Sequence, residues 1–272
     1  MSIAQVLDLL CCPLCSGAFR EADRSVRCPA GHSFDLAKHG QLNLLGRAAP
    51  PHADTAEMIA ARGRFLSAGH FDPITAAVAA SVPVADADVL EVGSGTGHHL
   101  ARVVEVSGRG VALDISPSAA RQAAAHDRIG AVVADVWRTL PLQDGGFDAV
   151  LAIFAPRNPA EFARVLRTGG VLVVVTPLPE HLIELRLPLG LLDIEAGKDD
   201  RLAAAMAGHL EPGPRSVCRY QVLLDTRATL DLVSMGPNAF HHDRSSLATQ
   251  IATIEPPIAV SVAVTVSVWL RP

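Results

Sequence analysis

The fold is indicated most clearly by the sequence DVLEVGSGTGHHLARVV, residues 88–104. Apolar residues run up to Val92, glycines follow at Gly93, Gly95 and Gly97, and apolar residues then recur at helical spacing. This pattern predicts a strand, a glycine turn and an amphipathic helix. Glycines let a backbone turn sharply and approach a ligand, which then faces the first amides of the helix. The spacing differs from the G-x-G-x-x-G of dinucleotide-binding folds.

An acidic residue on the strand, Glu91, followed by G-x-G-x-G resembles motif I of class I S-adenosylmethionine-dependent methyltransferases. The stretches after it agree: GVALDIS predicts a strand ending at Asp114, and AVVADVW predicts one ending at Asp135. FDAVLAIFAPRN and LRTGGVLVVVTP predict two more. This alternation favours an α/β fold of the class I, Rossmann-like kind, with a mostly parallel, seven-stranded, doubly wound sheet and ligands at the carboxyl ends of its strands.

The first 35 residues hold four of the five cysteines of the chain. Cys12-x-x-Cys15 and Cys28-x-x-x-His32 form two ligand pairs separated by twelve residues, a spacing typical of a tetrahedral zinc site. Four protein ligands close the coordination sphere, so we expect a structural Zn²⁺ that folds a small N-terminal zinc ribbon. Cys11 is an alternative to Cys12, with a less common spacing. The remaining alternative is chance, with buried thiols and a stray histidine.

Bulk composition is that of a globular enzyme, with 49% hydrophobic and 19% charged residues among 272. The formal net charge of -5 gives no sign of the basic domain that nucleic-acid-binding proteins usually show. The opening MSIAQVLDLL lacks the basic start of a signal peptide, and no apolar run reaches the roughly 20 residues of a membrane span. We therefore expect a cytoplasmic protein, in which clustered cysteines bind metal more often than they pair.

Three regions are expected: a zinc ribbon over 1–48, a linker helix region over 49–80 and a methyltransferase domain over 81–272. In the linker, DTAEMIAARGRFLSAGHF predicts a helix capped by Asp54, with Glu57 completing a capping box, that closes over the cofactor. Near the C-terminus, AVSVAVTVSVW alternates and predicts an antiparallel closing strand with one buried face.

The stretches GHSFDLAKHGQLNLL, DTAEMIAARGRFLSAGHF and TPLPEHLIEL, with the ribbon and the motif I core, resemble the 23S rRNA (guanine-N1)-methyltransferase family. GTGHHLARV, ADVWRTLPL, FAPRNPAE and MGPNAFHHD are most similar to its tylosin- and mycinamicin-resistance branch. The resemblance covers nearly the whole chain. It implies a homodimer that methylates N1 of one guanine in a 23S rRNA hairpin loop lining the ribosomal exit tunnel, near the macrolide site, and so gives macrolide resistance.

The resemblance also assigns site residues. It makes Cys12, Cys15, Cys28 and His32 the zinc ligands. It implies S-adenosylmethionine contacts at Phe71, where the family often has tyrosine, and at His99, Leu100 and His181. With the motif residues, the expected cofactor set is Phe71, Glu91, Gly93, Gly95, Gly97, His99, Leu100, Asp114, Asp135 and His181. Asp114 is expected to hold the ribose diol and Asp135 the adenine amino group, the alternative for both being a helix cap or turn.

Transfer to N1 requires loss of the N1 proton, and no general base stands out. Asp54 and Glu57 are candidates whose alternative role is helix capping. In the loop after the fourth strand, Phe154 is placed to stack on a base, Arg157 to hold a phosphate and Asn158 to read a base edge. Binding of RNA would need the balanced charges of the N-terminal region sorted onto different faces. The competing readings are a zinc-containing methyltransferase of small molecules such as natural products, and an inert binding module.

Overall fold

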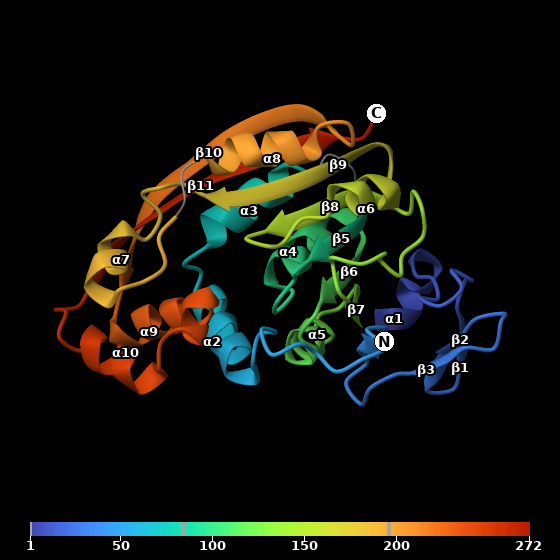
Figure 1. Cartoon of the computed structure of the whole chain (residues 1–272), viewed down its shortest axis with the longest axis horizontal. Helices are drawn as coiled ribbons and strands as arrows, with labels where there is room; N and C mark the ends of the chain where they lie inside the picture. The colour runs from blue at the N-terminus through green and yellow to red at the C-terminus, as the bar shows by residue number, and fades with distance from the viewer. Residues whose placement is uncertain (1, 83–84, 195–196) are drawn as a thin grey trace.

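The computed structural model describes residues 2–82, 85–194 and 197–272. A central sheet crosses the molecule, with helices on both of its faces and the small N-terminal module beside one edge (Figure 1). The strands of this sheet, in spatial order, are β10 (Glu211–Leu224), β11 (Ile258–Leu270), β9 (Leu166–Pro177), β8 (Phe147–Ile153), β5 (Asp88–Val92), β6 (Arg109–Asp114), β7 (Ile129–Val133) and β4 (Leu42–Asn43).

Neighbouring strands from β9 through β8, β5, β6 and β7 to β4 are parallel, whereas β11 is antiparallel to both β9 and β10. The mostly parallel, doubly wound sheet is confirmed. The predicted seven strands gain an eighth, because the two-residue β4 pairs with β7. This strand comes from the segment assigned to the ribbon.

The C-terminal strand β11 is antiparallel, as predicted, but it does not close the sheet. It lies between β9 and β10, so β10 is the edge strand. The expectation of one buried face is wrong as well: residues 262–267 are buried on both faces, because the neighbouring strands and helices cover the middle of β11. The exposed face belongs to β10 instead.

Two apolar cores lie on the two sides of the sheet, since alternate side chains of a strand point to opposite faces. Val89 joins one core and the next residue, Leu90, joins the other. The first core includes side chains of α2 (Ala56–Ser67), α3 (Asp72–Ala80), α4 (His98–Ser107), α5 (Pro117–Ala123), α7 (Ile183–Leu189), α9 (Thr226–Ser234) and α10 (Arg244–Ile251). The second includes side chains of α1 (Ser2–Gln5), η1 (Leu7–Leu9), α6 (Pro159–Val165) and α8 (Lys198–Met206).

The N-terminal module is packed into the second core. It contains a three-stranded antiparallel sheet, β1 (Arg20–Ala22), β2 (Ser25–Arg27) and β3 (Ser33–Asp35). The side chains of Val6, Phe19 and Val26 belong to the same apolar cluster as the sheet residues Leu90 and Val111. The proposed boundaries at residues 48 and 80 stay a prediction, and the module they delimit shares its core with the methyltransferase fold.

Close backbone approach fixes this docking. A Cβ on Gly130 of β7 would lie 2.1 Å from Cγ2 of Val6, so only glycine admits the N-terminal segment at this distance. Arg109 of β6 adds an ion pair of 2.7 Å with Asp8.

The N-cap of helix α2 lies one residue after the predicted Asp54. Its N-cap is Thr55, whose hydroxyl accepts a hydrogen bond from the backbone of Met58 at 3.2 Å. Asp54 instead forms an ion pair of 2.6 Å with Arg62, and Glu57 forms one of 3.1 Å with Arg244. The capping box of Asp54 and Glu57 is therefore wrong, because Thr55 caps the helix and both carboxylates are paired with arginines.

Candidate cofactor cavity and zinc site

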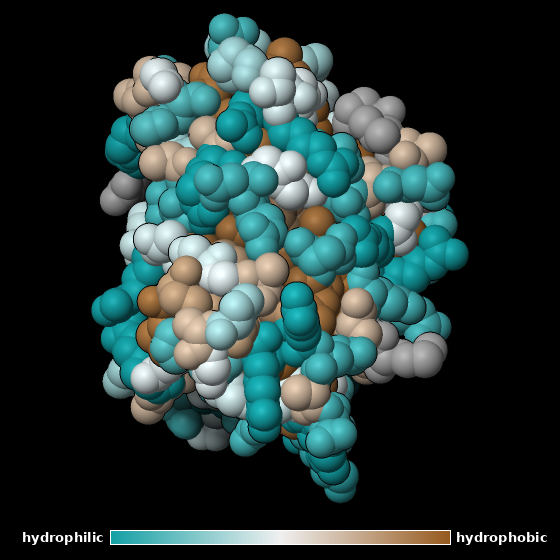
Figure 2. Space-filling model, turned by 90° about the vertical axis from the view of Figure 1, so that its right-hand side faces the viewer, coloured by the Kyte–Doolittle hydropathy of each residue, from teal (hydrophilic) through white to brown (hydrophobic). Residues whose placement is uncertain are grey.

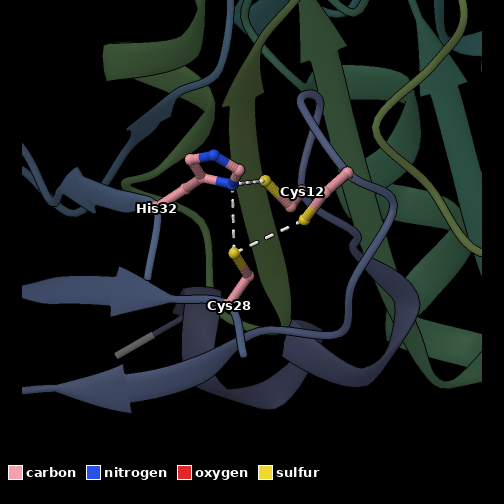
Figure 3. A group of neighbouring side chains, drawn as sticks. Cys12, Cys28 and His32 are labelled. Carbon is pink, nitrogen blue, oxygen red and sulfur yellow. Dashed lines mark hydrogen bonds between the residues drawn. The ribbon is translucent and has the colours of Figure 1, made fainter. Parts of the chain in front are cut away.

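The four predicted metal ligands converge at the base of the N-terminal module. Cys12 Sγ lies 3.5 Å and Cys28 Sγ 3.3 Å from Nδ1 of His32, and these side chains point toward one another (Figure 3). Cys15 Sγ lies 3.5 Å from Cys28 Sγ, and all four ligand atoms lie within 4.8 Å of one another. Tetrahedral Zn²⁺ with bonds of about 2.0–2.3 Å needs ligand separations of roughly 3.3–3.8 Å. The donor set and its spacing fit a structural zinc ion.

Cys11 is not part of this group, which settles the choice between the first two cysteines. Its backbone bridges to Ala18, and its side chain is buried apart from the other thiols. Burial raises the pKa of Cys11 to about 11, so it stays a neutral thiol at pH 7. Cys12, with the commoner two-residue spacing, is therefore the cysteine whose position fits the metal site.

A cavity of about 440 Å³ lies at the carboxyl ends of the central strands. Its size is within the range of small-molecule and cofactor sites. The lining comes from the end of β5 and its glycine turn, the loop after β8, the end of β9, α2, α7 and the segment after α9. Ligands of open α/β sheets bind in this place because the strand ends leave a crevice there.

The turn after β5 needs glycine, because its backbone is left-handed and leaves no room for side chains, and this open backbone suits a ligand. Gly93 has φ +60°, and a Cβ there would lie 2.8 Å from Cβ of Ala155. Gly97 has φ +74° and is the N-cap of α4. Between them, the buried hydroxyls of Ser94 and Thr96 have no hydrogen-bond partner within the described part of the chain. Buried polar atoms without partners are rare and favour a bound ligand at this turn.

Two buried carboxyl groups organise the turn. Asp114, at the end of β6, accepts hydrogen bonds of 2.8 Å from the backbone amides of Gly95 and Ser116. Burial raises its pKa, against the lowering effect of these two hydrogen bonds. Glu91 accepts a hydrogen bond of 3.2 Å from the amide of Leu100. Burial raises the pKa of Glu91 to about 8, so this carboxyl is mainly protonated at pH 7.

Two histidines face the cavity as neutral rings. His99 shares a hydrogen bond of 2.8 Å with the hydroxyl of Thr75, and burial lowers the pKa of His99 to about 3. Nδ1 of His181 accepts a hydrogen bond of 3.2 Å from the amide of Ala263, which leaves the proton on Nε2. Burial lowers the pKa of His181 to about 4. Neither ring is basic enough to hold a proton taken from a substrate at pH 7.

The predicted cofactor residues fall into two groups by position. Six line the cavity: Phe71, Glu91, Gly93, Gly95, His99 and His181. The others, Gly97, Leu100, Asp114 and Asp135, stand behind or beside it rather than among its lining residues. Leu100 is buried and contributes its amide to Glu91. Asp135 lies two residues beyond the end of β7 and forms an ion pair of 2.9 Å with Arg47.

The catalytic candidates also separate. Arg157 lines the cavity, and Asn158 does not. The Asn158 side chain caps α6, accepting from the amide of Glu161 at 3.5 Å and donating to the carbonyl of Val136 at 2.9 Å. Both of its polar groups are thus used within the fold. Asp54 and Glu57 lie outside the lining and are ion-paired with Arg62 and Arg244 respectively.

Several lining residues were not identified from the sequence. Arg62 of α2 reaches the glycine turn, where a Cβ on Gly95 would lie 2.6 Å from its Nη1. It also donates a hydrogen bond of 2.6 Å to the carbonyl of Met235. Arg186 reaches the cavity from α7 and pairs with Asp193 at 2.8 Å. Their positions follow from contacts across long sequence separations, which no local pattern contains.

Within the described residues, no helix has the length and apolar character needed to cross a membrane.

Comparison with known proteins matches two family profiles to this chain. Residues 10–47 match a family described as "RlmA, N-terminal", and residues 89–170 match one described as "Methyltransferase domain". The fold is found among solved structures as well. The YcgJ protein of Bacillus subtilis superposes with a TM-score of 0.54 at 15% identity, covering 74% of this chain and 99% of that one. A protein of Bacillus halodurans C-125 gives a TM-score of 0.51 over 73% of this chain.

Relatives of similar length are also found. A Streptomyces fradiae protein named 23S rRNA (guanine(748)-N(1))-methyltransferase is 44% identical, and the match covers 97% of each chain. A Micromonospora griseorubida protein, provisionally named 23S rRNA (guanine-N(1)-)-methyltransferase, is 45% identical over 95% of this chain and 96% of its own. These matches include both the zinc module and the methyltransferase fold.

Proposed function

Because the chain belongs to the 23S rRNA (guanine-N1)-methyltransferase family, we propose that it methylates N1 of a guanine in 23S rRNA, with S-adenosylmethionine as methyl donor. The similarity to the Streptomyces fradiae protein carries the proposal, because it spans 97% of each chain rather than the methyltransferase core alone. That protein is named for guanine 748, and we take the equivalent position as the target.

The cavity and the residues beside it are suited to this donor. The glycine turn and the unpartnered hydroxyl of Ser94 would receive its amino-acid part, and Asp114, beside the cavity, its ribose diol. Asp135, beyond the next strand, would reach the adenine, with Arg47 fixing its carboxylate. When bound, S-adenosylmethionine supplies an electrophilic methyl group. The protein's part is then to align N1 with that methyl group.

Removal of the N1 proton is not assigned to a strong base. His99 and His181 have lowered pKa values, and Glu91 is mainly protonated at pH 7. Asp54 and Glu57 are committed to arginines. The arrangement supports a reaction in which alignment contributes most, with the proton leaving to water.

The N-terminal module offers two basic side chains toward RNA. Arg20 of β1 lies directly opposite Arg27 of β2, so the two exposed side chains share one face. Neither arginine forms an ion pair within the described residues, and the side of the molecule that carries the module is mostly hydrophilic (Figure 2). The hairpin face opposite these arginines includes the buried Val26, which joins the core. Phosphates of an RNA backbone suit such a pair of free cations.

We further propose that the chain acts as a cytoplasmic homodimer and that its modification of the exit tunnel gives macrolide resistance. Size-exclusion chromatography with light scattering tests the dimer. Expression in a macrolide-sensitive bacterium tests the resistance, with an Asp114→Ala control: a raised inhibitory concentration of tylosin is expected for the unchanged chain only.

Transfer of tritium from labelled S-adenosylmethionine to unmodified 23S rRNA tests the proposed function. Labelling by the wild-type chain and its loss in Asp114→Ala are expected. Confirmed cofactor binding with no transfer to rRNA or ribosomal subunits would overturn the proposal and favour the alternative, a zinc-containing methyltransferase of small molecules. Absence of cofactor binding would favour an inert binding module.

A further inference from the structure

Phe154 is an aromatic side chain in an unusual state. It is the first residue after β8, and its backbone is left-handed with φ +53°. This conformation is uncommon for a residue other than glycine, and strain of this kind concentrates at functional sites. A hydrogen bond of 3.2 Å from its amide to the carbonyl of Val175 holds the conformation.

The strained backbone leaves the Phe154 ring at the mouth of the cavity. The residue is 43% exposed and lines the cavity, whereas Phe71 deeper inside is 2% exposed. Behind it, the His181 ring is stacked at a centroid distance of 5.7 Å and an interplanar angle of 27°. The centroid of the Phe71 ring lies 6.3 Å from that of Phe154 and 6.2 Å from that of His181. The exposed ring is therefore supported from behind and has one free face.

A positively charged side chain beside Phe154 at the mouth of the cavity is suited to bind a nucleobase. Arg157, three residues further along the loop, is half-buried and lines the cavity. It forms no ion pair or hydrogen bond within the described residues, and burial lowers its pKa. A partly buried cation without a partner is costly unless a ligand completes it. Guanine presents two acceptors, O6 and N7, on one edge.

We propose that the free face of Phe154 is the platform on which the target guanine stacks after leaving the RNA loop, with Arg157 at its acceptor edge. This proposal rests on the proposed function. A base within a hairpin loop must leave its stack to reach a methyl donor in the cavity. Stacking on an aromatic ring of the protein then replaces the stacking energy that the base loses. The strain at Phe154 then has a purpose, because it turns the ring toward the entering base.

Phe154→Leu tests the stacking, since leucine keeps apolar volume and removes the ring. Base–aromatic stacking corresponds to a loss of about 5-fold to 150-fold in kcat/KM for RNA. Phe154→Tyr, which keeps the ring, is expected to stay within about 3-fold of wild type. Phe240→Leu is the matched control, because Phe240 is equally exposed at 43% but does not line the cavity. It is expected to behave as wild type.

A second readout does not depend on turnover. The probe is the 23S rRNA hairpin with 2-aminopurine beside the target guanine, whose fluorescence rises when its neighbour leaves the stack. A rise with wild type and Phe154→Tyr, and none with Phe154→Leu, is expected, with unchanged cofactor affinity by calorimetry. The proposal is overturned if Phe154→Leu keeps both the rise and the rate, or if it loses cofactor affinity instead. If the wild-type chain methylates no RNA, the proposed function itself fails.

Discussion

Glu91→Gln is expected to remove a pH-dependent loss of stability. The folded protein holds a proton on Glu91 because burial raises its pKa from the ordinary 4.5 to about 8. The unfolded chain releases that proton above its ordinary pKa. Since the unfolded state then binds fewer protons, stability falls as pH rises between these two values. Glutamine resembles the protonated side chain and still offers an oxygen to the amide of Leu100, which now donates at 3.2 Å.

The magnitude follows from the two pKa values. Each pH unit in which only the folded state holds the proton costs about 1.4 kcal/mol. With pKa values of 4.5 and about 8, the wild-type chain should lose about 3 kcal/mol relative to Glu91→Gln between roughly pH 5 and pH 7.5. The titration of other groups cancels in this difference, because the two chains share them.

Urea denaturation at the two pH values, without cofactor, measures this difference. The unfolding free energy of wild type minus that of Glu91→Gln is expected to fall by about 3 kcal/mol, with equal m-values. A difference that does not change with pH would refute the reasoning, because Glu91 would then be ionised in the folded protein. A difference that grows with pH would mean that its pKa is lowered.

Three other predictions concern the zinc site and a buried aspartate. Removal of zinc by a strong chelator is expected to lower the midpoint temperature of thermal unfolding. Elemental analysis should give one zinc per chain for wild type and for Cys11→Ser, but not for Cys28→Ser. Equal zinc contents in all three chains would exclude the assigned ligands. Asp231 contacts Arg64 at 2.6 Å, and Asp231→Asn is expected to cost about 2 kcal/mol at pH 7, a value reduced for the partial exposure of the arginine. Because its ion pairs lower the pKa of Asp231 against the effect of burial, this cost should disappear as pH falls below the ordinary 3.8, and urea titrations that show an equal cost at low pH would contradict it.

The sequence predicted those features that depend on residues close together in the chain. The glycine turn, the strands beside it and the cysteine spacing each need particular residues at fixed offsets, so the sequence alone identifies them. The two-residue strand β4 has no such pattern, since its place depends on β7 nearly ninety residues away. For the same reason Arg62 was not recognised in the cavity: helical spacing places it on the same side of α2 as Met58 and Leu66, but only the packing of α2 over the turn brings it to Gly95.

In the candidate site, too, some residues were predicted correctly and others depended on the three-dimensional packing. Phe71, Glu91 and His181 line the cavity, whereas Asn158 proved to be a helix cap, a role that asparagine commonly takes and that depends on the exact start of α6. The position of Asp114 behind the turn, bound to two amides, likewise follows from how β5 and β6 pair.

Mapping the modified nucleotide is the most direct test of the proposed methylation of 23S rRNA. Unmodified 23S rRNA is incubated with the purified chain and S-adenosylmethionine, and primer extension then locates the stop that N1-methylguanine causes, since the methyl group blocks base pairing. One stop is expected, at the guanine equivalent to position 748 named for the Streptomyces fradiae relative, and no stop is expected with Asp114→Ala. A stop elsewhere would contradict the assigned target, and no stop with a cofactor-binding wild-type chain would contradict the proposed methylation of 23S rRNA.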